Sequence, residues 1–464
     1  MTPVPSAVES LETPPSPGSS RPVSVGGAPR ERCRLTLPPP CRHPAPCGLP
    51  CELKLGPERH AALELGSLAR LAIMAVPGTR GSFREQAQEL LAQVRCIVSR
   101  QPHALTPTTL MVFLRDAAHE AECRDIIHAT FGLALPVTTF AVQPPCCGAE
   151  LGVELWALGG PQVKVERFGS EVMAVESDGI RWVYCGDVRG EAGPEGAHAE
   201  ATQAFRRLRE QLALAGANCG HLVRTWIYIN QITEGPAGSQ RYQELNRART
   251  ECYRDIRFGA ETGATGVAGP IYPASTGIGT LGTHITLAGL ALTSARPDVF
   301  IVPLESPQQT AAYHYADCYS PQSPKFSRAM AVVQGHFVTL LVSGTASIVA
   351  ERTVHPGDIL AQTRQTLDNI GCLIAPENLA RHGLPGTGAS FRDVAKLRVY
   401  VKHAADYEAC RSVVESRLPG VPCIYLHADI CRPDLLVEIE AVAFCPLAAP
   451  LRRRQEITPN SLSS

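Results

Sequence analysis

The sequence predicts an α+β fold in which one chain carries three copies of a single unit, arranged as a pseudo-trimer. The composition is that of a globular protein, with 44% apolar and 19% charged residues. The 464 residues correspond to about three folding units of roughly 150 residues each. The same order of elements, a hairpin, a helix, a strand, a second helix and a closing strand, recurs three times along the chain.

The first copy is the most degraded of the three. A helix is expected where apolar residues such as Phe83, Leu90 and Val94 recur at helical spacing. In order, its elements are a hairpin over 63–76, a helix over 83–98, a strand over 110–114, a helix over 117–131 and a strand over 152–158. The closing strand contains Val-Glu-Leu, which the third copy repeats as Val-Glu-Ile.

The second and third copies repeat this order with stronger patterns. The second comprises hairpin strands over 173–176 and 180–186, a helix over 201–215, a strand over 224–230, a helix over 240–253 and a strand over 285–292. The third comprises hairpin strands over 326–333 and 337–344, a helix over 359–374, a strand over 396–401, a helix over 406–418 and a strand over 435–444. Gly335 interrupts the last hairpin between two apolar, β-branched runs, as a turn signal does.

These repeats set the predicted domain boundaries. We divide the chain into a disordered Pro-rich extension (1–60), a degenerate first repeat (61–160), a second repeat (161–300), a third repeat (301–447) and a flexible tail (448–464). Each repeat is a mostly antiparallel sheet with one face that two helices can cover. The remaining faces of the three sheets can pack on one another around a pseudo-threefold axis, as in a closed trimer. Such a chain needs no further copy of itself, so we expect a monomer.

Charge and hydropathy exclude several partners. With 43 basic against 44 acidic residues, the net charge of −1 provides no basic surface for nucleic acid. No run reaches the roughly 18 apolar residues of a membrane helix, and the N-terminus lacks the pattern of a signal peptide. We therefore expect a cytoplasmic protein, in which the 17 cysteines are reduced thiols.

Motifs for metals and cofactors are also missing from the sequence. The cluster of Cys33, Cys41, Cys47 and Cys51 has spacings unlike those of paired zinc knuckles. The sequence has no GxGxxG after a strand, no P-loop and no HExxH. We therefore expect neither a metal nor an organic cofactor.

The closing strand of the third copy carries two carboxylates. Aligning the closing strands places Glu438 level with Glu154 of the first copy and Thr286 of the second. Only the third copy has a second carboxylate two residues on, Glu440, and residues two apart in a strand share a face. Either both side chains lie on the solvated face of an edge strand, or their apolar neighbours bury them. Burial favours the neutral form of a carboxyl group, as a general acid requires at neutral pH.

Two further segments are rich in cations or tyrosines. The helix over 240–253 and the residue after it carry four arginines, Arg241, Arg247, Arg249 and Arg254, which favour a solvated basic face over an anion site. The loop over 313–328 combines three tyrosines, two Ser-Pro turns and two cations just before a strand. It is either the lining of a pocket or a surface loop.

Three segments of the last third resemble the RidA family of small trimeric α+β proteins, which are imine deaminases. They are 365–370 (QTLDNI), 398–402 (RVYVK) and 437–443 (VEIEAVA). Members of that family hold the substrate carboxylate with an arginine in a Pro-Ala-Arg turn. The corresponding turn here ends at Cys423, so imine deamination is disfavoured.

A longer pattern is similar to the chorismatases, single-chain relatives of that fold which split chorismate and release pyruvate. The matching segments are 224–229 (RTWIYI), 241–249 (RYQELNRAR), 273–279 (PASTGIG), 312–315 (AYHY), 341–347 (LVSGTAS) and 428–438 (ADICRPDLLVE). The similarity as a whole covers roughly 83–444 in consistent order. The resemblance implies that chorismate is the substrate and that the fold is built from three RidA-like repeats.

Residue roles follow from this resemblance position by position. Glu438 corresponds to the catalytic acid of the chorismatases. Gly344 and Cys431 stand where members that form 3-hydroxybenzoate carry glycine and cysteine, whereas members that form the dihydrodiol have a bulkier residue such as alanine at the Gly344 position. The candidates for substrate binding are Arg249, Tyr253, Tyr315, Tyr319, Ser323, Phe326 and Arg398.

The resemblance also suggests a mechanism. A neutral Glu438 protonates the terminal methylene of the enolpyruvyl ether, and the new carboxylate stabilises the resulting oxocarbenium ion. Pyruvate then leaves, and the ring either keeps a diol or aromatises to 3-hydroxybenzoate or 4-hydroxybenzoate. Two other classes stay open: an imine or enamine deaminase, and a binding protein for aromatic acids, although a pure anion binder gains nothing from paired carboxylates.

Overall fold

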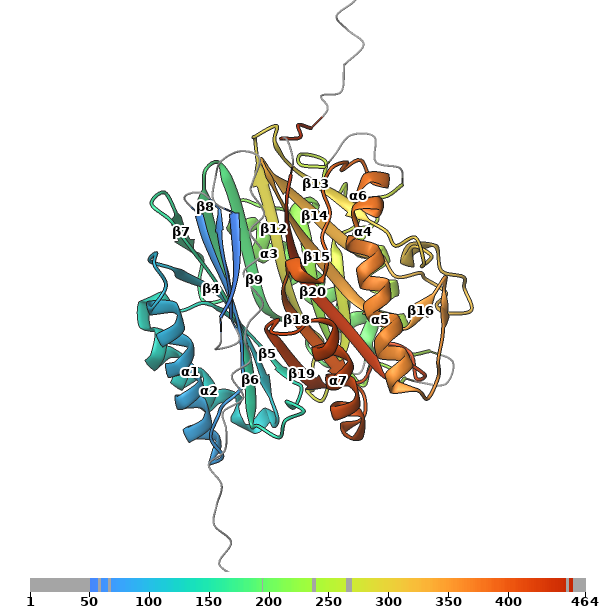
Figure 1. Cartoon of the computed structure of the whole chain (residues 1–464). Helices are drawn as coiled ribbons and strands as arrows, with labels where there is room; N and C mark the ends of the chain where they lie inside the picture. The colour runs from blue at the N-terminus through green and yellow to red at the C-terminus, as the bar shows by residue number, and fades with distance from the viewer. Residues whose placement is uncertain are drawn as a thin grey trace, which may run out of the picture. The chain divides into compact units, whose positions relative to one another are not determined.

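The computed structural model describes residues 51–56, 60–65, 68–193, 195–235, 239–263, 269–447 and 450–453. In this part of the chain, the strands form three six-stranded sheets and a two-stranded ribbon, and helices cover one face of each large sheet (Figure 1). The predicted α+β class is confirmed. The predicted extension, apart from residues 51–56 and 60, and the predicted tail, apart from 450–453, lie outside the described residues.

Sheet 1 is formed by the first part of the chain. Its strands, in spatial order, are β1 (Cys51–Gly56), β2 (His60–Leu65), β3 (Leu68–Ala75), β6 (Leu151–Gly159), β4 (Thr106–Leu114) and β5 (Val137–Val142). Its helices are α1 (Phe83–Ser99) and α2 (Glu120–Phe131). Helix α1 begins where it does because Ser82 and Glu85 form a capping box, in which each side chain accepts a hydrogen bond from the other residue's backbone N–H.

Sheets 2 and 3 have the same strand order as sheet 1. Sheet 2 consists of β7 (Lys164–Arg167), β8 (Val172–Ser177), β9 (Ile180–Arg189), β12 (Thr286–Ser294), β10 (Leu222–Asn230) and β11 (Ala274–Thr280), with α3 (Gly196–Leu214) and α4 (Arg241–Tyr253). Sheet 3 consists of β13 (Val299–Leu304), β14 (Ala329–Gln334), β15 (Phe337–Ala346), β20 (Val437–Pro446), β18 (Val394–Val401) and β19 (Cys423–His427), with α5 (Ile359–Ile374), α6 (Pro376–Arg381) and α7 (Tyr407–Arg417).

Short elements complete the described part of the chain. The ribbon consists of β16 (Ile348–Val349) and β17 (Arg352–Thr353), and 3-10 turns lie at Ala117–His119, Gly132–Ala134, Cys219–His221, Ala312–His314, Phe391–Asp393 and Ala404–Asp406. None of the helices in the described residues is both long and apolar enough to cross a membrane.

Alternation along the strands divides the core into two kinds of cluster. On the helix side of sheet 3, for example, Ile439 of β20 packs with Leu367 of α5. On the opposite, helix-free faces, Met74 of sheet 1, Tyr228 of sheet 2 and Tyr400 of sheet 3 belong to a single buried cluster. The three helix-free faces therefore share one interior, in which polar strand residues from different sheets can meet.

Two expectations about these sheets were wrong. Residues 51–56 and 60, assigned to the disordered extension, belong to β1 and β2, which pair antiparallel with Cys51 opposite Leu65. In addition, each sheet contains one parallel pair that was not predicted, namely β4 with β5, β10 with β11 and β18 with β19. The missed strand β11 reads ASTGIGT, whose small and polar residues give little strand signal.

Candidate active site

Glu438 and Glu440 lie on β20, which is a central strand between β15 and β18. Their exposed fractions are 4% and 1%. The alternative of a solvated edge strand is therefore wrong. Both side chains leave the helix-free face of sheet 3, because the intervening Ile439 packs toward the helices.

The two carboxyl groups have opposite protonation preferences. Burial, and then the negative charge of Glu440, raise the pKa of Glu438 to about 8. Burial alone would raise the pKa of Glu440 too, but Arg398, Arg224 and Lys396 outweigh it and lower that pKa below the ordinary value. At neutral pH the strand thus presents a neutral carboxylic acid next to a carboxylate, the arrangement expected of a general acid.

Glu438 lies in the wall of a cavity of about 570 Å³ between sheets 2 and 3. Sheet 2 contributes part of α4, including Tyr242 and Arg249, and Gly277 of β11. Sheet 3 contributes the loop before β14, the bulge of β15 and the loop before β20. The loop over 313–328 is therefore a pocket lining, as one of its two interpretations predicted.

Most of the predicted site residues lie in this lining: Arg249, Tyr315, Tyr319, Phe326, Gly344, Cys431 and Glu438. Three others, Tyr253, Ser323 and Arg398, are not part of this lining, and their role in substrate binding stays a prediction. Tyr253 packs edge-on against Phe205 and Phe258 in the core beneath the helices of sheet 2. The Ser323 hydroxyl donates a hydrogen bond to the backbone oxygen of Tyr313 at 2.9 Å.

Arg398 is the third predicted residue that lies outside the lining of this cavity. It lies behind Glu438, where it bridges Glu154 of sheet 1 and Glu440. Its strand contains the predicted RidA-like segment, but the strand alternation could not tell whether its polar side chains face the cavity or the shared interior. The structure places Arg398 in the interior.

Four arginines line the cavity, and three of them were missed as site residues. Arg249, which was predicted, is 1% exposed, and its Nε has no hydrogen-bond partner within the described residues. Arg328 donates to the backbone oxygen of Thr310 at 3.1 Å. Arg432 lies 4.1 Å from the ring centroid of Tyr319, and Arg352 completes the set. Arg328 is the last residue of the loop over 313–328, and Arg432 directly precedes a Pro-Asp turn. Both lie in loops, whose position in the fold cannot be predicted from hydrophobic periodicity.

Only one arginine of α4 reaches the cavity. Arg241 pairs with the buried Glu200 at 2.7 Å, and Arg247 pairs with Glu244 of its own helix at 2.7 Å while remaining half exposed. The helix therefore combines both interpretations: an outer basic face and one buried guanidinium that can bind an anion. A carboxylate of the substrate is the natural counter-charge for such an arginine.

We expect Arg249→Met to raise KM for a dicarboxylate substrate by about ten- to a hundredfold with a smaller change in kcat. The reason is that a charged hydrogen bond present in both the bound substrate and the transition state contributes about 1.5–3 kcal/mol. Steady-state kinetics of the purified variant measure this. Arg247→Met, which removes the same charge from the outer face of the same helix, is the matched control; an equal rise in KM there would contradict the assignment.

Gly344 leaves room for the Glu438 carboxyl group. A Cβ at position 344 would overlap Glu438 Oε1 and would lie 3.1 Å from Thr276 Cγ2. Gly344 occupies a bulge of β15, because Val342 pairs with Ala441 and Thr345 with Ile439 of the neighbouring strand. A residue with a side chain at this position must displace the acid.

Ion pairs occupy the corresponding place between sheets 1 and 2. The bulge of β9 lies between the Cys185–Gly289 and Val188–Leu287 pairs, so Asp187 takes the place that Gly344 has in sheet 3. Asp187 is bound by Arg124 and Arg189, and both arginines also bind Glu120 at 2.7 Å. Charged side chains therefore fill this place.

The strand register corrects the alignment of the carboxylates. Glu154 lies opposite Met111 of β4, and Glu440 lies opposite Arg398 of β18. Met111 and Arg398 both precede the same Val-aromatic core of their strands, so Glu154 is level with Glu440 and not with Glu438. The predicted alignment was wrong by two residues, an error that preserves the face and hence cannot be detected from alternation.

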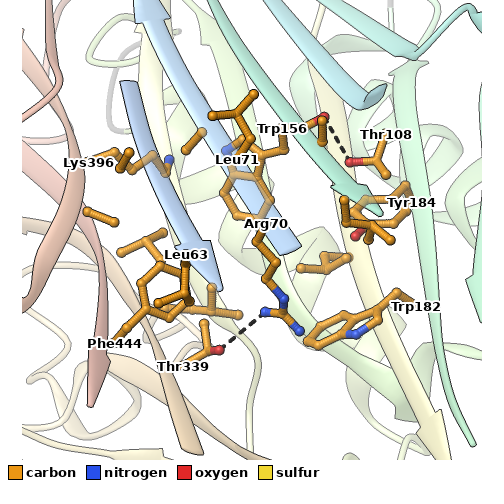
Figure 2. A pocket seen from close by; sticks show the side chains of 18 residues that line it. Leu63, Arg70, Leu71, Thr108, Trp156, Trp182, Tyr184, Thr339, Lys396 and Phe444 are labelled. Atoms are coloured by element: carbon orange, nitrogen blue, oxygen red, sulfur yellow. Dashed lines mark hydrogen bonds between the residues drawn. The ribbon is translucent and has the colours of Figure 1, made fainter. Parts of the chain in front are cut away.

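A second cavity of about 60 Å³ lies among the three sheets (Figure 2). It is mainly apolar: Trp156 comes from sheet 1, Trp182 from sheet 2 and Phe444 from sheet 3. The Arg70 side chain extends along it to Gln334 Oε1 at 2.9 Å. This cavity shares no lining residue with the larger one and has no carboxyl group in its lining, so the acid–base chemistry belongs to the larger cavity.

Comparisons with known proteins agree with this fold. Residues 321–445 match the family model "Endoribonuclease L-PSP", so the third sheet has the fold of that class. Residues 154–291 match the model "Chorismatase FkbO/Hyg5-like, N-terminal". A crystal structure of a chorismatase at 1.08 Å resolution covers 82% of this chain and 100% of its own, with a TM-score of 0.58 and 24% identity, and shows the same fold.

Two relatives from Streptomyces hygroscopicus define the family. The chain is 34% identical over 277 residues to a 3-hydroxybenzoate synthase, an alignment that covers 58% of this chain and 77% of that protein. It is 36% identical over 275 residues to a chorismatase, covering 57% of this chain and 74% of the relative. The chain belongs to the chorismatase family.

Proposed function

We propose that this enzyme cleaves the enolpyruvyl ether of chorismate, releasing pyruvate and forming 3-hydroxybenzoate, with Glu438 as the general acid. The observation that carries the proposal is a buried, neutral Glu438 in the wall of a cavity that also holds four arginines. Chorismate has two carboxylates, which arginines can bind, and one acid-labile enol ether. The 3-hydroxybenzoate synthase of S. hygroscopicus supports the choice of product.

The reaction needs one proton at the start. The O–H bond of Glu438 breaks as a C–H bond forms at the terminal methylene, which becomes a methyl group. The ether carbon becomes an oxocarbenium ion, and the Glu438 carboxylate beside it stabilises the positive charge. Water adds to this carbon and returns one proton to Glu438; its other proton passes to the ring oxygen as the bond between that oxygen and the carbon breaks, and pyruvate leaves. Loss of the second ring hydroxyl as water aromatises the ring, so no water is consumed overall.

Gly344 and Cys431 are the residues that we propose to determine the product. This role for Gly344 is supported by the space it leaves for the acid, since a Cβ at this position would overlap Glu438 Oε1. Burial, and then the nearby Glu438, raise the pKa of the Cys431 thiol to about 12. The Cys431 thiol is therefore neutral, and we propose that it contacts the substrate ring as a small side chain and does not act as a nucleophile.

The architecture proposed for this function is a pseudo-trimer in one chain. It is supported by the identical strand order of the three sheets and by the interior that their helix-free faces share. On this view the second and third repeats extend over 161–300 and 301–447, the first repeat, predicted over 61–160, is extended to begin at β1 with Cys51, and the active enzyme is a monomer. Described cysteines such as Cys123, Cys185 and Cys410 are free thiols, which suits the reducing cytoplasm.

The direct test is to incubate the purified enzyme with chorismate and to measure pyruvate and the aromatic products by chromatography. Pyruvate with 3-hydroxybenzoate is expected. Pyruvate with the dihydrodiol or 4-hydroxybenzoate would be consistent with Glu438 as the general acid but would overturn the assignment of 3-hydroxybenzoate as the product. No pyruvate above the blank would favour an aromatic-acid binding protein or, if imines are hydrolysed, a deaminase.

The pH dependence of kcat/KM should follow the ionisation of Glu438. Because the protonated form of Glu438 is the reactive one and its pKa is raised to about 8, kcat/KM should be constant near neutral pH and fall above pH 8. The decline should approach tenfold per pH unit. Pyruvate release measured from pH 6 to 9.5 tests this. A decline that begins near pH 4.5, where an ordinary glutamate ionises, would contradict the assignment.

A further inference from the structure

Five buried charged residues form a network where the three sheets meet. Glu154 comes from sheet 1, Arg224 from sheet 2, and Lys396, Arg398 and Glu440 from sheet 3. Each of these side chains is at most 5% exposed. The three cations and two carboxylates leave one net positive charge in an interior where charges interact more strongly than in water.

The contacts within this network are specific. Glu154 Oε1 lies 2.7 Å from Lys396 Nζ, and Glu154 Oε2 accepts a hydrogen bond from Arg398 Nε. On the other side, Glu440 lies 2.8 Å from Arg224 Nη2, 3.3 Å from Arg398 Nη1 and 3.9 Å from Lys396 Nζ. Glu154 and Glu440 therefore share Lys396 and Arg398. Figure 2 shows that Lys396 also borders the apolar cavity, which provides no counter-charge.

The network reaches the wall of the active site through Thr276. The Thr276 hydroxyl donates to Glu440 Oε2 at 2.6 Å, and it accepts hydrogen bonds from the Arg224 guanidinium at 2.6 Å and from the Gly344 backbone N–H at 3.0 Å. Gly344 in turn borders the Glu438 carboxyl group. The Thr276 hydroxyl and Gly344 therefore connect the charged network to the acid.

Other titratable and charged groups lie around Glu438. On β20 and the elements packed against it they are Glu440, Arg224, Arg328, Cys431, Tyr242 and Arg249, and the same cavity is also lined by Tyr315, Cys318, Tyr319, Arg352, Arg432 and Asp434. Tyr400 of β18 is its cross-strand partner. Glu154 bonds to Trp156, Lys396 and Arg398, none of which lines the cavity, so its charge acts on the acid from behind these groups.

We propose that Glu154 is a positioning residue for the acid: with Lys396 it balances the charge around Glu440 and thereby sets the pH at which Glu438 loses its proton. The inference rests on the proposed function. Without the Glu154 charge, Lys396 and Arg398 face only Glu440, and the added positive potential favours ionised Glu438. Without the Lys396 charge, the network is neutral, and Glu438 holds its proton to higher pH. Through Glu154, sheet 1 thus influences the protonation of an acid that lies between sheets 2 and 3.

Opposite shifts in the pH profile test this proposal. In the full chain, Glu154→Gln should move the alkaline decline of kcat/KM for pyruvate release down by about half to one pH unit, and Lys396→Met should move it up by a similar amount. Glu200→Gln, which removes a carboxylate as buried as Glu154 from beneath the helices of sheet 2, is the matched control and should leave the decline in place. Equal profiles in Glu154→Gln and Lys396→Met, or shifts of the same sign, would overturn the proposal.

Two additions separate this outcome from misfolding and from failure of the proposed function. The double variant Glu154→Gln/Lys396→Met removes one charge of each sign, and its profile should return to that of the parent enzyme; it replaces a single variant that circular dichroism shows to be unfolded. An infrared titration of the Glu438 carboxylic acid band, assigned by its loss in Glu438→Gln, measures the same shifts without substrate. If chorismate is not cleaved, the proposed function fails, and the infrared shifts alone decide the role of Glu154.

Discussion

Replacing Glu438 with glutamine should abolish pyruvate release from chorismate while leaving the protein as stable as the parent. A glutamine amide has nearly the shape of a protonated carboxyl group but gives up no proton, so the general-acid contribution of about 10²–10⁴ in rate is lost. Stability should be retained because Glu438 is already neutral at neutral pH, and the exchange replaces one uncharged group with another. The measurements are the turnover number for pyruvate and the midpoint of urea unfolding.

Glu440 provides the control, since it lies two residues away on the same face. It is ionised and bound by Arg224, Thr276 and Trp226. Glu440→Gln leaves buried cations without their partner, and removing one member of a buried pair costs about 3–5 kcal/mol of stability. The two variants should thus differ in stability, which is retained at position 438 and lost at position 440. Glu440→Gln also removes a charge that raises the pKa of Glu438, so its alkaline decline in activity should move to lower pH. Near-parental turnover in Glu438→Gln would exclude it as the acid.

Much of the fold could be predicted because apolar periodicity repeats along the chain. The hairpin of sheet 3 around Gly335, the helix containing Leu367 and the closing strand of Ile439 lie where the pattern places them. The parallel strands β5, β11 and β19 could not be predicted in the same way. They are short and follow the second helix of each unit, and β11 consists mainly of small residues that pack only because Tyr242 and β15 lie beside it.

The site was predicted in part for a similar reason. Strand alternation shows that Glu438 and Glu440 share a face, and this face is buried. It does not show where along the face one sheet meets another, so Arg398 was assigned to the substrate although it binds Glu154 in the interior. Arginines of the cavity lining such as Arg432 lie in loops. Their position depends on tertiary contacts, such as the contact of Arg432 with the Tyr319 ring.

Gly344→Ala should reduce formation of 3-hydroxybenzoate by about tenfold or more and shift the product toward the dihydrodiol. The added methyl group would overlap Glu438 Oε1, and the backbone cannot retreat because the Gly344 N–H is bonded to Thr276 and the flanking residues of the bulge pair with β20. The carboxyl group must therefore turn away. A displaced acid still protonates the enol ether, but the substrate ring no longer lies in the position that favours loss of its second hydroxyl.

Gly277→Ala separates this effect from simple crowding. It adds the same methyl group to the same cavity, but the new atom would lie 3.0 Å from Tyr242 Cε2 and not against Glu438. We expect a lower rate with an unchanged product ratio in that variant, measured by chromatography of the aromatic and diol products after equal pyruvate release. An equal change in both variants would mean that the product depends on the volume of the cavity, and an unchanged ratio in Gly344→Ala would mean that position 344 does not determine the product. A change confined to position 344 would mean that it depends on where the acid is held, because only there does the methyl group reach the carboxyl that starts the reaction.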